Sequence, residues 1–302
     1  MTTTPEIRNI LVPLDGSTLA ESSLAPVLTL ARATGATVTL LHVLEHDAPE
    51  SIQGRPPRGG APGPAASLAD VARRWDGETT FAQHVHPNPE HDIAASIAQH
   101  AAELDADLIA ITTHGGGGLR GLVFGRIAQQ VLQQTDRPVL VVRPDQVPAR
   151  RFICRRIAVT LDGTADAAQA LPLARSLASA PGAGLTLIRV VPTLGAVRGE
   201  RAVPATMLPT ATAALLDMQV EEAARYLAAV RDDIGDPSIV ALVRRGDVAN
   251  EIAAAVNETG CDLVLLSTHG KAGLEGFVTG SVAAKILGRL SQPIILLRSP
   301  RE

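Results

Sequence analysis

The sequence repeats itself, and this repeat constrains the fold more than any other feature. The stretch NILVPLDGS at residues 9–17 matches RIAVTLDGT at residues 156–164, and DLIAITTHG at 107–115 matches DLVLLSTHG at 262–270. Both matches keep the same order along the chain, so the two halves are copies of one structural unit. A chain of 302 residues is also about twice the usual length of one domain. The sequence therefore predicts two domains of the same fold.

Within each half, short β-branched runs alternate with stretches rich in Ala and Leu, a pattern typical of βαβ units around a parallel sheet. Several runs are apolar at every position, as expected for strands that helices cover on both faces. We therefore predict an α/β fold with a five-stranded parallel sheet, flanked by helices, in each half. The expected strands cover residues 8–14, 37–44, 81–86, 107–112 and 138–143, and then 156–161, 184–191, 238–244, 262–267 and 293–298.

The two copies differ in the middle. Residues 49–66 are rich in Pro and Gly, which predicts an exposed flexible loop and leaves room for only a short helix at about 67–75. The second half has instead a long stretch rich in Ala, Leu, Glu and Arg, which predicts a full helix at roughly 210–232. The repeat divides the chain into a first domain at 1–145, a linker at 146–152 and a second domain at 153–302.

Charge and composition argue against several classes of function. The net charge is -4 and no basic block offsets it, which disfavours nucleic acid and anionic membranes as partners. The two cysteines, Cys154 and Cys261, have no CxxC spacing, so a reducing compartment is the simpler inference. The first residues lack a signal-peptide pattern, and no apolar run approaches the length of a membrane span. We therefore expect a soluble, cytoplasmic protein.

Two elements that bear on ligand binding follow the strands of each half. In a doubly wound sheet, ligands bind beyond the carboxyl ends of the strands. Asp15 and Asp162 follow the first strands, and a glycine-rich connection after the fourth strand of the second half ends at Gly280 and Ser281. Glycine, a helix N-terminus and a hydroxyl together favour an anion such as a phosphate. These residues raise the hypothesis that a nucleotide spans from Asp162 to Ser281, with its ribose hydroxyls at Asp162.

Both halves resemble the universal stress protein family, whose ATP-binding members carry Gly-x-x-Gly, nine residues, and then Gly followed by Ser or Thr. The second half reads Ser267-x-x-Gly270, nine residues, and Gly280-Ser281, and it departs only where Ser267 replaces Gly. The resemblance covers nearly the whole chain and implies two Rossmann-like domains of the adenine nucleotide alpha hydrolase-like type. It also implies the ligand contacts of the second half: Thr160, Leu161 and Val190 for adenine, Asp162 for ribose, and Gly270, Lys271, Gly280, Ser281 and Val282 for phosphates.

The first half departs from the family pattern at both ends. It reads Thr112-x-x-Gly115, nine residues, and Gly125-Arg126, so Thr replaces the first Gly and Arg replaces the hydroxyl residue. Arg126 either clamps a phosphate or fills the pocket, and the sequence leaves both readings open. We therefore rank this site second. The contacts that the resemblance implies here are Pro13, Leu14 and Val43 for adenine, Asp15 for ribose, and Gly115, Gly116, Gly125, Arg126 and Ile127 for phosphates.

Ordinary structural roles compete with these functional ones. Asp15 and Asp162 also suit capping of the next helix or stabilisation of an Asp-Gly turn. His84 and His86, with His91 nearby, have metal-ligand character, but no matching cluster occurs in the second half. We interpret them as surface histidines and expect no metal site.

The resemblance implies a tandem universal stress protein that binds ATP, with or without magnesium, mainly in its second domain and acts as a stress-response sensor or adaptor. One alternative is a slow ATPase or phosphotransferase in the same pocket, although no residue suited to orient a nucleophile is evident and we name no catalytic residue. Another is a nucleotide-free interaction scaffold. The fifth strands, at 138–142 and 293–297, are candidates for edge pairing, which would join the halves as an intramolecular pseudo-dimer and leave a homodimer optional.

Overall fold

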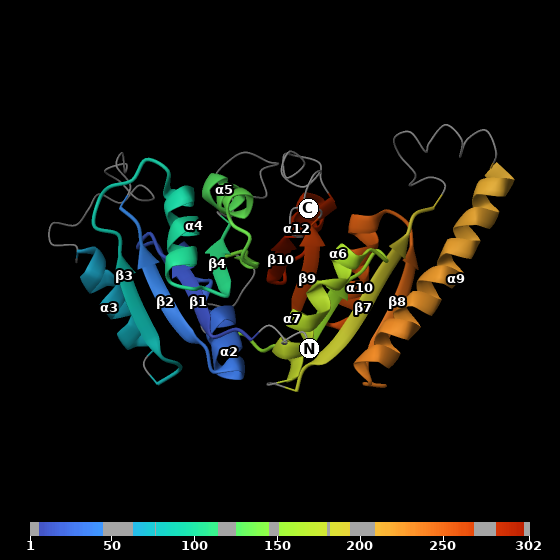
Figure 1. Ribbon diagram of the computed structural model, residues 1–302, viewed down its shortest axis with the longest axis horizontal. Coiled ribbons are helices and arrows are strands. Elements are labelled where there is room, and N and C mark those ends of the chain that lie inside the picture. Colours follow the sequence, from blue (N-terminus) through green and yellow to red (C-terminus); the bar gives the residue numbers. More distant parts are fainter. Residues whose placement is uncertain are drawn as a thin grey trace. The chain divides into compact units, whose positions relative to one another are not determined.

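The computed structural model describes two compact units (Figure 1). Unit 1 comprises Met1–Ile153 and Ser291–Arg298, and unit 2 comprises Cys154–Leu290 and Ser299–Glu302. The residues that the structure describes are 6–44, 63–75, 77–113, 125–144, 151–179, 182–193, 209–268 and 282–298.

Unit 1 contains a sheet with the strand order β3-β2-β1-β4-β5-β10. Strands β1 to β5 pair in parallel, whereas β10 pairs antiparallel with β5. The order reverses at β1, which has β2 on one side and β4 on the other, and this is the switch point at which doubly wound sheets bind ligands. The strands are β1 (Asn9–Pro13), β2 (Thr37–His42), β3 (Phe81–Val85), β4 (Leu108–Thr112), β5 (Val139–Val142) and β10 (Ile294–Arg298).

The helices of unit 1 begin and end at residues that suit those positions. Ser17 caps the first helix and Asp92 caps the fourth, each by accepting a backbone N–H of the first turn. Gly35 ends the second helix in the left-handed conformation, with φ of 73°. The helices are α1 (Thr18–Glu21), α2 (Leu24–Thr34), α3 (Pro64–Arg74), α4 (Ile93–Glu103) and α5 (Arg126–Gln134).

Unit 2 repeats the arrangement with the strand order β9-β6-β7-β8, all parallel. Its first strand again lies between the second and the fourth. The strands are β6 (Arg156–Thr160), β7 (Gly184–Val191), β8 (Val240–Arg245) and β9 (Leu263–Thr268). The helices are α6 (Ala165–Ala168), α7 (Ala170–Ser179), α9 (Pro209–Ile234), α10 (Val248–Thr259) and α12 (Val282–Arg289).

The cores consist mainly of aliphatic side chains from the central strands and the inner faces of the helices. Strand β5 is buried at all four positions, and β1, β4, β6 and β9 each have at least three consecutive buried residues. This burial on both faces explains why the strands are continuous apolar runs in the sequence. The predicted α/β fold with mostly parallel strands is confirmed, and each of the ten expected strands forms. The prediction of five parallel strands in each half is not met, because the fifth strand of the second half, β10, belongs to unit 1 and pairs antiparallel with β5 there.

Two helices differ in extent from the sequence predictions. Helix α3 begins at Pro64, inside the stretch predicted to be a loop, because proline at the first helical position has a suitable φ and needs no N–H partner there. Helix α9 covers 26 residues, slightly more than predicted. The rest of the predicted 49–66 loop, up to residue 62, lies outside the described residues, as does most of the predicted linker.

Strand β10 carries a charged anchor at its end. Its register pairs Ile294 with Val141 and Leu296 with Val139. Nη1 of Arg298 donates to the carbonyl oxygens of Gln133 at 3.2 Å and Thr135 at 3.3 Å, and it also forms an ion pair with Asp136. The Arg298 side chain is only 9% exposed, so these contacts satisfy part of a largely buried cation.

Candidate functional site

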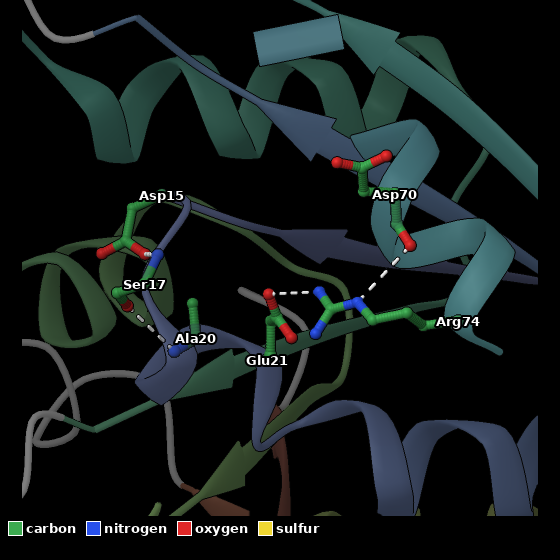
Figure 2. Close-up of polar contacts among 6 residues, drawn as sticks. All are labelled: Asp15, Ser17, Ala20, Glu21, Asp70 and Arg74. Atoms are coloured by element: carbon green, nitrogen blue, oxygen red, sulfur yellow. Dashed lines mark hydrogen bonds and ion pairs between the residues drawn. The ribbon is translucent and has the colours of Figure 1, made fainter. Parts of the chain in front are cut away.

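The turn after strand β1 places the first predicted aspartate at the carboxyl end of the unit 1 sheet. Oδ1 of Asp15 accepts a 2.8 Å hydrogen bond from the backbone N–H of Ser17, and Gly16 between them has φ of 81°. Oγ of Ser17 accepts a 3.1 Å bond from the N–H of Ala20 and so caps α1 (Figure 2). Asp15 itself is exposed. The aspartate therefore shapes the turn while its side chain remains accessible.

The equivalent turn of unit 2 is built in the same way. Oδ1 of Asp162 accepts hydrogen bonds from the N–H and the hydroxyl of Thr164, at 2.9 and 2.7 Å. The Thr164 hydroxyl oxygen accepts a 3.1 Å bond from the N–H of Ala167, and Gly163 has φ of 93°. Asp162 is exposed. Both aspartates thus have the turn-stabilising role considered from the sequence, and both are exposed at the carboxyl end of the first strand of their unit.

The second strand of each unit runs beside this turn. The N–H of Leu161 donates to the carbonyl of Ile188 at 2.8 Å, and the N–H of Leu14 donates to the carbonyl of Leu41 at the same distance. Both Leu161 and Leu14 are 4% exposed, so only their backbone atoms are suited to contact a ligand. The structure therefore brings the predicted adenine-contacting backbone next to the predicted ribose-contacting aspartate in each unit.

The remaining predicted adenine contacts lie at the same strand ends. Val43 follows β2 by one residue, and Val190 is the penultimate residue of β7. Both are half-buried. Pro13, the last residue of β1, is half-buried, and Thr160, the last residue of β6, is buried. Each unit therefore presents an aliphatic surface of limited area next to its aspartate turn.

The fourth strand reaches the same edge of the sheet. Thr160 pairs with Leu266, so the next residue of β9, Ser267, lies level with Leu161 at the start of the turn. In unit 1, Thr112 ends β4 and pairs with Val142. Ser267 and Thr112 are both half-exposed. The first position of the family motif therefore adjoins the aspartate turn in unit 2.

The phosphate part of the predicted site is described only at its helical end. Gly125 is the N-cap of α5 in extended conformation and makes no side-chain cap bond. Arg126 and Ile127 are the first residues of α5, Arg126 exposed and Ile127 half-buried, while Val282 begins α12 and is 47% exposed. The remaining predicted phosphate contacts lie outside the described residues: Gly115, Gly116, Gly270, Lys271, Gly280 and Ser281.

Arg189 of β7 is a site-adjacent residue that the sequence analysis missed. Its guanidinium lies against the Asp162 turn, within 2.9 to 3.0 Å of the point where a Cβ on Gly163 would stand. On its other side it lies 3.8 Å from Glu222 of α9 and 5.2 Å from the ring centre of Tyr226. Arg189 occupies the position that His42 has in unit 1, and because the residue type differs between the two copies, the repeat did not single it out.

His42 makes a different contact in unit 1. Its Nδ1 lies 2.8 Å from the carbonyl oxygen of Leu14. A carbonyl oxygen only accepts, so Nδ1 carries the proton in this hydrogen bond. The same position in the two copies therefore supports the aspartate turn by two different chemical means.

A histidine cluster lies at β3 and α4, away from the aspartate turn in sequence. Nδ1 of His86 lies 3.3 Å from Nε2 of His100, and the ring of His84 is 4.8 Å from that of His100 between centroids. Nε2 of His86 also contacts Glu90 at 2.8 Å. Burial and the neighbouring histidines lower the pKa of His84. His84 and His86 were predicted to be surface histidines, but both are half-buried and adjoin the buried His100, which the sequence analysis did not single out. No group of three or more potential ligands in the described part of the chain has the arrangement of a metal site.

Helix α3 is tied to α1 by an ion pair at the side of unit 1. Nη2 of Arg74 lies 2.7 Å from Oε1 of Glu21, and Nε of Arg74 donates to the carbonyl of Asp70 at 3.4 Å (Figure 2). Arg74 and Asp70, with Ser67 and Arg73, line an open hollow on α3. Arg73 pairs with Asp70, so both arginines of the hollow already have carboxylate partners.

The fold and these turns define the class of the chain: a tandem α/β protein with doubly wound parallel sheets and an exposed aspartate at the carboxyl end of each first strand. A family model described as the universal stress protein family matches residues 6–143 and again residues 154–298. The chain therefore belongs to the universal stress protein family and carries two copies of its domain. In the described part of the chain, no helix combines the length and apolarity that a membrane crossing needs.

Individual relatives agree with this assignment. Universal stress protein Rv1996 of Mycobacterium tuberculosis and universal stress protein Mb2019 of Mycobacterium bovis are each 24% identical to the chain over 198 residues. The match covers 65% of this chain and 60% of each relative, so the chain matches somewhat under two thirds of their length.

Solved structures share the fold along the whole chain. A universal stress protein from Archaeoglobus fulgidus superimposes with a TM-score of 0.65 at 15% identity and covers 96% of this chain and 98% of its own. A putative universal stress protein from Pseudomonas aeruginosa gives a TM-score of 0.64 at 17% identity, with 99% and 95% covered. At these identities the likeness concerns the fold alone.

Proposed function

We propose that this chain is an ATP-binding stress-response sensor or adaptor whose nucleotide binds mainly in the second copy. The observation that carries the proposal is the exposed Asp162 at the carboxyl end of β6, next to the half-exposed Ser267 at the end of β9. This edge is where doubly wound sheets bind ligands, at the strand where the order reverses.

The chemistry of the accessible groups supports an adenine nucleotide. The exposed carboxylate of Asp162 suits ribose hydroxyls, which are hydrogen-bond donors. Val190 offers half-buried aliphatic surface for a base, and the chain has too few aromatic residues to provide stacking instead. The family motif supplies the phosphate contacts in sequence, through Gly270, Lys271 and the Gly280-Ser281 pair. A magnesium ion would accompany the phosphates as part of the ligand.

The second copy is the stronger candidate because its motif is nearly intact. A hydroxyl at Ser281 and an ammonium at Lys271 suit phosphate binding, whereas the first copy has Arg126 and Gly116 at the matching positions. Arg126 is the exposed first residue of α5. We propose that the first copy binds nucleotide more weakly than the second.

An adaptor role is supported by the pairing of the fifth strands. Strand β10 pairs antiparallel with β5, so the fifth strands of the two sequence repeats share a ladder. We propose that this pairing makes the chain an intramolecular pseudo-dimer of its two repeats, with a further homodimer optional. Light scattering on the purified chain tests whether the further homodimer forms, because the monomer has a mass of 31.4 kDa.

Titration calorimetry with Mg-ATP tests the nucleotide proposal, with Asp162→Ala and Asp15→Ala as a matched pair. We expect one dominant site per chain, a large loss of affinity with Asp162→Ala and little change with Asp15→Ala. Absence of binding by the wild-type chain would reject the proposal of ATP binding. Equal losses from both variants would reject the preference for the second copy.

A second pair of variants tests the phosphate contacts. Ser281→Arg copies the residue of the first repeat, and Gly280→Asp places a negative charge where phosphate is proposed to bind. We expect both to weaken binding of ATP, Gly280→Asp through charge repulsion and Ser281→Arg through loss of the hydroxyl and added bulk. Unchanged affinity in both would move the phosphate site elsewhere.

A further inference from the structure

We propose that Arg189 is a positioning residue that ties helix α9 to the Asp162 turn, so that Glu222 and Tyr226 of α9 help to set the affinity of that turn for its ligand. The inference rests on the proposed nucleotide site of the second copy. It concerns residues that the family motif does not include.

The guanidinium of Arg189 lies against the Asp162 turn. All three terminal atoms of the guanidinium, Cζ and both Nη, lie 2.9 to 3.0 Å from the position that a Cβ on Gly163 would take. The Arg189 side chain is only 14% exposed. The guanidinium therefore occupies the space that a side chain at position 163 would need, and Asp162 and Thr164 flank this glycine.

Arg189 also contacts helix α9. Nη2 of Arg189 lies 3.8 Å from Oε1 of Glu222, and its Cζ lies 5.2 Å from the centre of the Tyr226 ring. A guanidinium over an aromatic face at this distance is attracted by the ring. Because the cation is mostly excluded from water, it depends on these partners more than an exposed arginine would. A displacement of α9 would therefore shift Arg189 and change its contact with the Asp162 turn.

Helix α9 is itself held on the sheet next to Arg189. Leu216 and Ala223 of α9 are buried against Val191, with Val220 and Val243 beside them. Val191 is two residues from Arg189 and so faces the same side of β7. The apolar contacts fix the position of α9 on the sheet. Glu222 and Tyr226 of the same helix contact Arg189, which lies beside the turn.

Ionisation of the Tyr226 phenol reports on its contact with Arg189. Its hydroxyl oxygen is buried and has no hydrogen-bond partner among the described residues. Burial raises the pKa of Tyr226, the charge of Arg189 lowers it, and the charge of Asp162 raises it again. The phenol therefore senses both the arginine and the aspartate of the turn. Tyr226 is also the only tyrosine of the chain, so the ultraviolet absorbance of tyrosinate reports on this residue alone.

The first copy supports the same turn without this link. Its equivalent of Arg189 is His42, whose ring donates to the carbonyl of Leu14. Helix α3, the shorter counterpart of α9 with 11 residues, instead contacts α1 through Arg74 and Glu21. The arginine link is therefore a property of the copy that has the nearly intact nucleotide motif.

An alkaline titration of the nucleotide-free chain tests the Arg189–Tyr226 contact on its own. We expect the Arg189→Ala variant to ionise Tyr226 at a higher pH than the wild type, because the cation that favours the phenolate is lost. Arg189→Lys keeps the charge and is expected to titrate nearer to the wild type. An unchanged midpoint in Arg189→Ala would overturn the contact, whether or not the chain binds any nucleotide.

Calorimetry with Mg-ATP then tests the effect on the site, with Arg245→Ala as the matched control. Arg245 pairs with Asp217 of α9 at 2.9 Å, and both side chains are largely exposed, so its loss removes a surface ion pair of α9 that includes neither Arg189 nor its partners. We expect Arg189→Ala to weaken ATP binding roughly three- to tenfold, Glu222→Gln and Tyr226→Leu to weaken it less, and Arg245→Ala to leave it unchanged.

The outcomes separate the two proposals. If the wild-type chain binds ATP and Arg189→Ala binds it equally well, the positioning role is wrong and the proposed nucleotide site stands. If Arg245→Ala loses as much affinity as Arg189→Ala, the effect comes from α9 docking in general, and the role of Arg189 is likewise wrong. If the wild-type chain binds no ATP, the proposed function fails, and the titration of Tyr226 still decides the Arg189 contact.

Discussion

The carboxylate of Asp107 accepts a 2.9 Å hydrogen bond from the backbone N–H of Asn9, and the same oxygen accepts a 2.8 Å bond from Arg8. Asp262 makes the equivalent bonds to Arg155 and Arg156, at 2.7 and 3.1 Å. In each unit, an aspartate just before the fourth strand thus holds the start of the first strand. These hydrogen bonds fix the amino ends of β1 and β6. The proposed ligand aspartates, Asp15 and Asp162, follow the carboxyl ends of the same strands.

Replacement of Asp107 by Ala should therefore destabilise unit 1. We expect the free energy of unfolding to fall by about 1–3 kcal/mol, because two backbone amides lose a charged acceptor. Chemical denaturation measures this change, with the exposed Glu6→Ala as the control that should have little effect. If Asp107→Ala loses no more free energy of unfolding than Glu6→Ala, the hydrogen bonds of Asp107 do not stabilise unit 1.

Gly163 and Gly16 offer a second matched comparison. Both have positive φ, so alanine strains the backbone at either position. A Cβ at Gly16 meets nothing within 4 Å, whereas one at Gly163 meets the Arg189 guanidinium. We expect Gly16→Ala to cost about 1 kcal/mol of stability and Gly163→Ala to cost more. Equal unfolding midpoints for the two variants would argue against tight packing of Arg189 on the turn.

The thiol of Cys154 should be protected in the folded chain. Cys154 is 6% exposed, and burial, with smaller contributions from Asp262 and Cys261, raises its pKa to about 12. Because the thiolate is the reactive form, we expect iodoacetamide to label Cys154 at neutral pH only after unfolding. Mass spectrometry of the labelled peptide measures this difference. Rapid labelling of the native chain would contradict it.

The same raised pKa affects stability at high pH. The folded state holds the Cys154 proton more tightly than the unfolded state, whose thiol has the ordinary pKa of 9.0. The contribution of the protonated Cys154 thiol to the free energy of unfolding is therefore complete below pH 9 and is lost as the pH rises toward 12. We expect Cys154→Ala to show a flatter loss of stability than the wild type across this interval, as measured by denaturant unfolding at several pH values.

His84 should make unit 1 sensitive to mild acid. Burial and the nearby His100 and His86 lower its pKa, so the unfolded state binds the proton more readily. Stability that is present above pH 6.5 is then lost as the pH falls through the lowered pKa of the folded state. We expect His84→Gln to reduce this loss and the exposed His91→Gln to leave it unchanged, with thermal unfolding between pH 7 and pH 5 as the measurement. Parallel curves for the wild type and His84→Gln would contradict the assignment.

Much of the fold was predictable because the repeat and the apolar runs are local signals. Strands β1 and β6 end within one residue of the predicted ends, each before an Asp-Gly turn, because burial on both faces leaves continuous apolar runs. The start of α3 at Pro64 was not predicted, because proline usually breaks structure and its role depends on whether it occupies the first helical turn.

The supporting contacts of the site were less predictable than its aspartates. Asp162 stands in a motif that repeats, whereas Arg189 acquires its role only when β7 is paired with β6 and α9 folds back over the strand. His100 likewise becomes part of a cluster only when α4 packs near β3, which brings it to His84 and His86. Such contacts join residues that are distant in the sequence, and single-sequence patterns carry little information on them.

A crystal structure of the chain grown with Mg-ATP would locate the bound nucleotide. We expect nucleotide density in the second copy, with the ribose at Asp162 and the phosphates at Gly280 and Ser281, and with Arg189 still beside Gly163. Density in the first copy alone, at Asp15 and Arg126, or a nucleotide bound away from both aspartate turns would show that the proposed site is wrong.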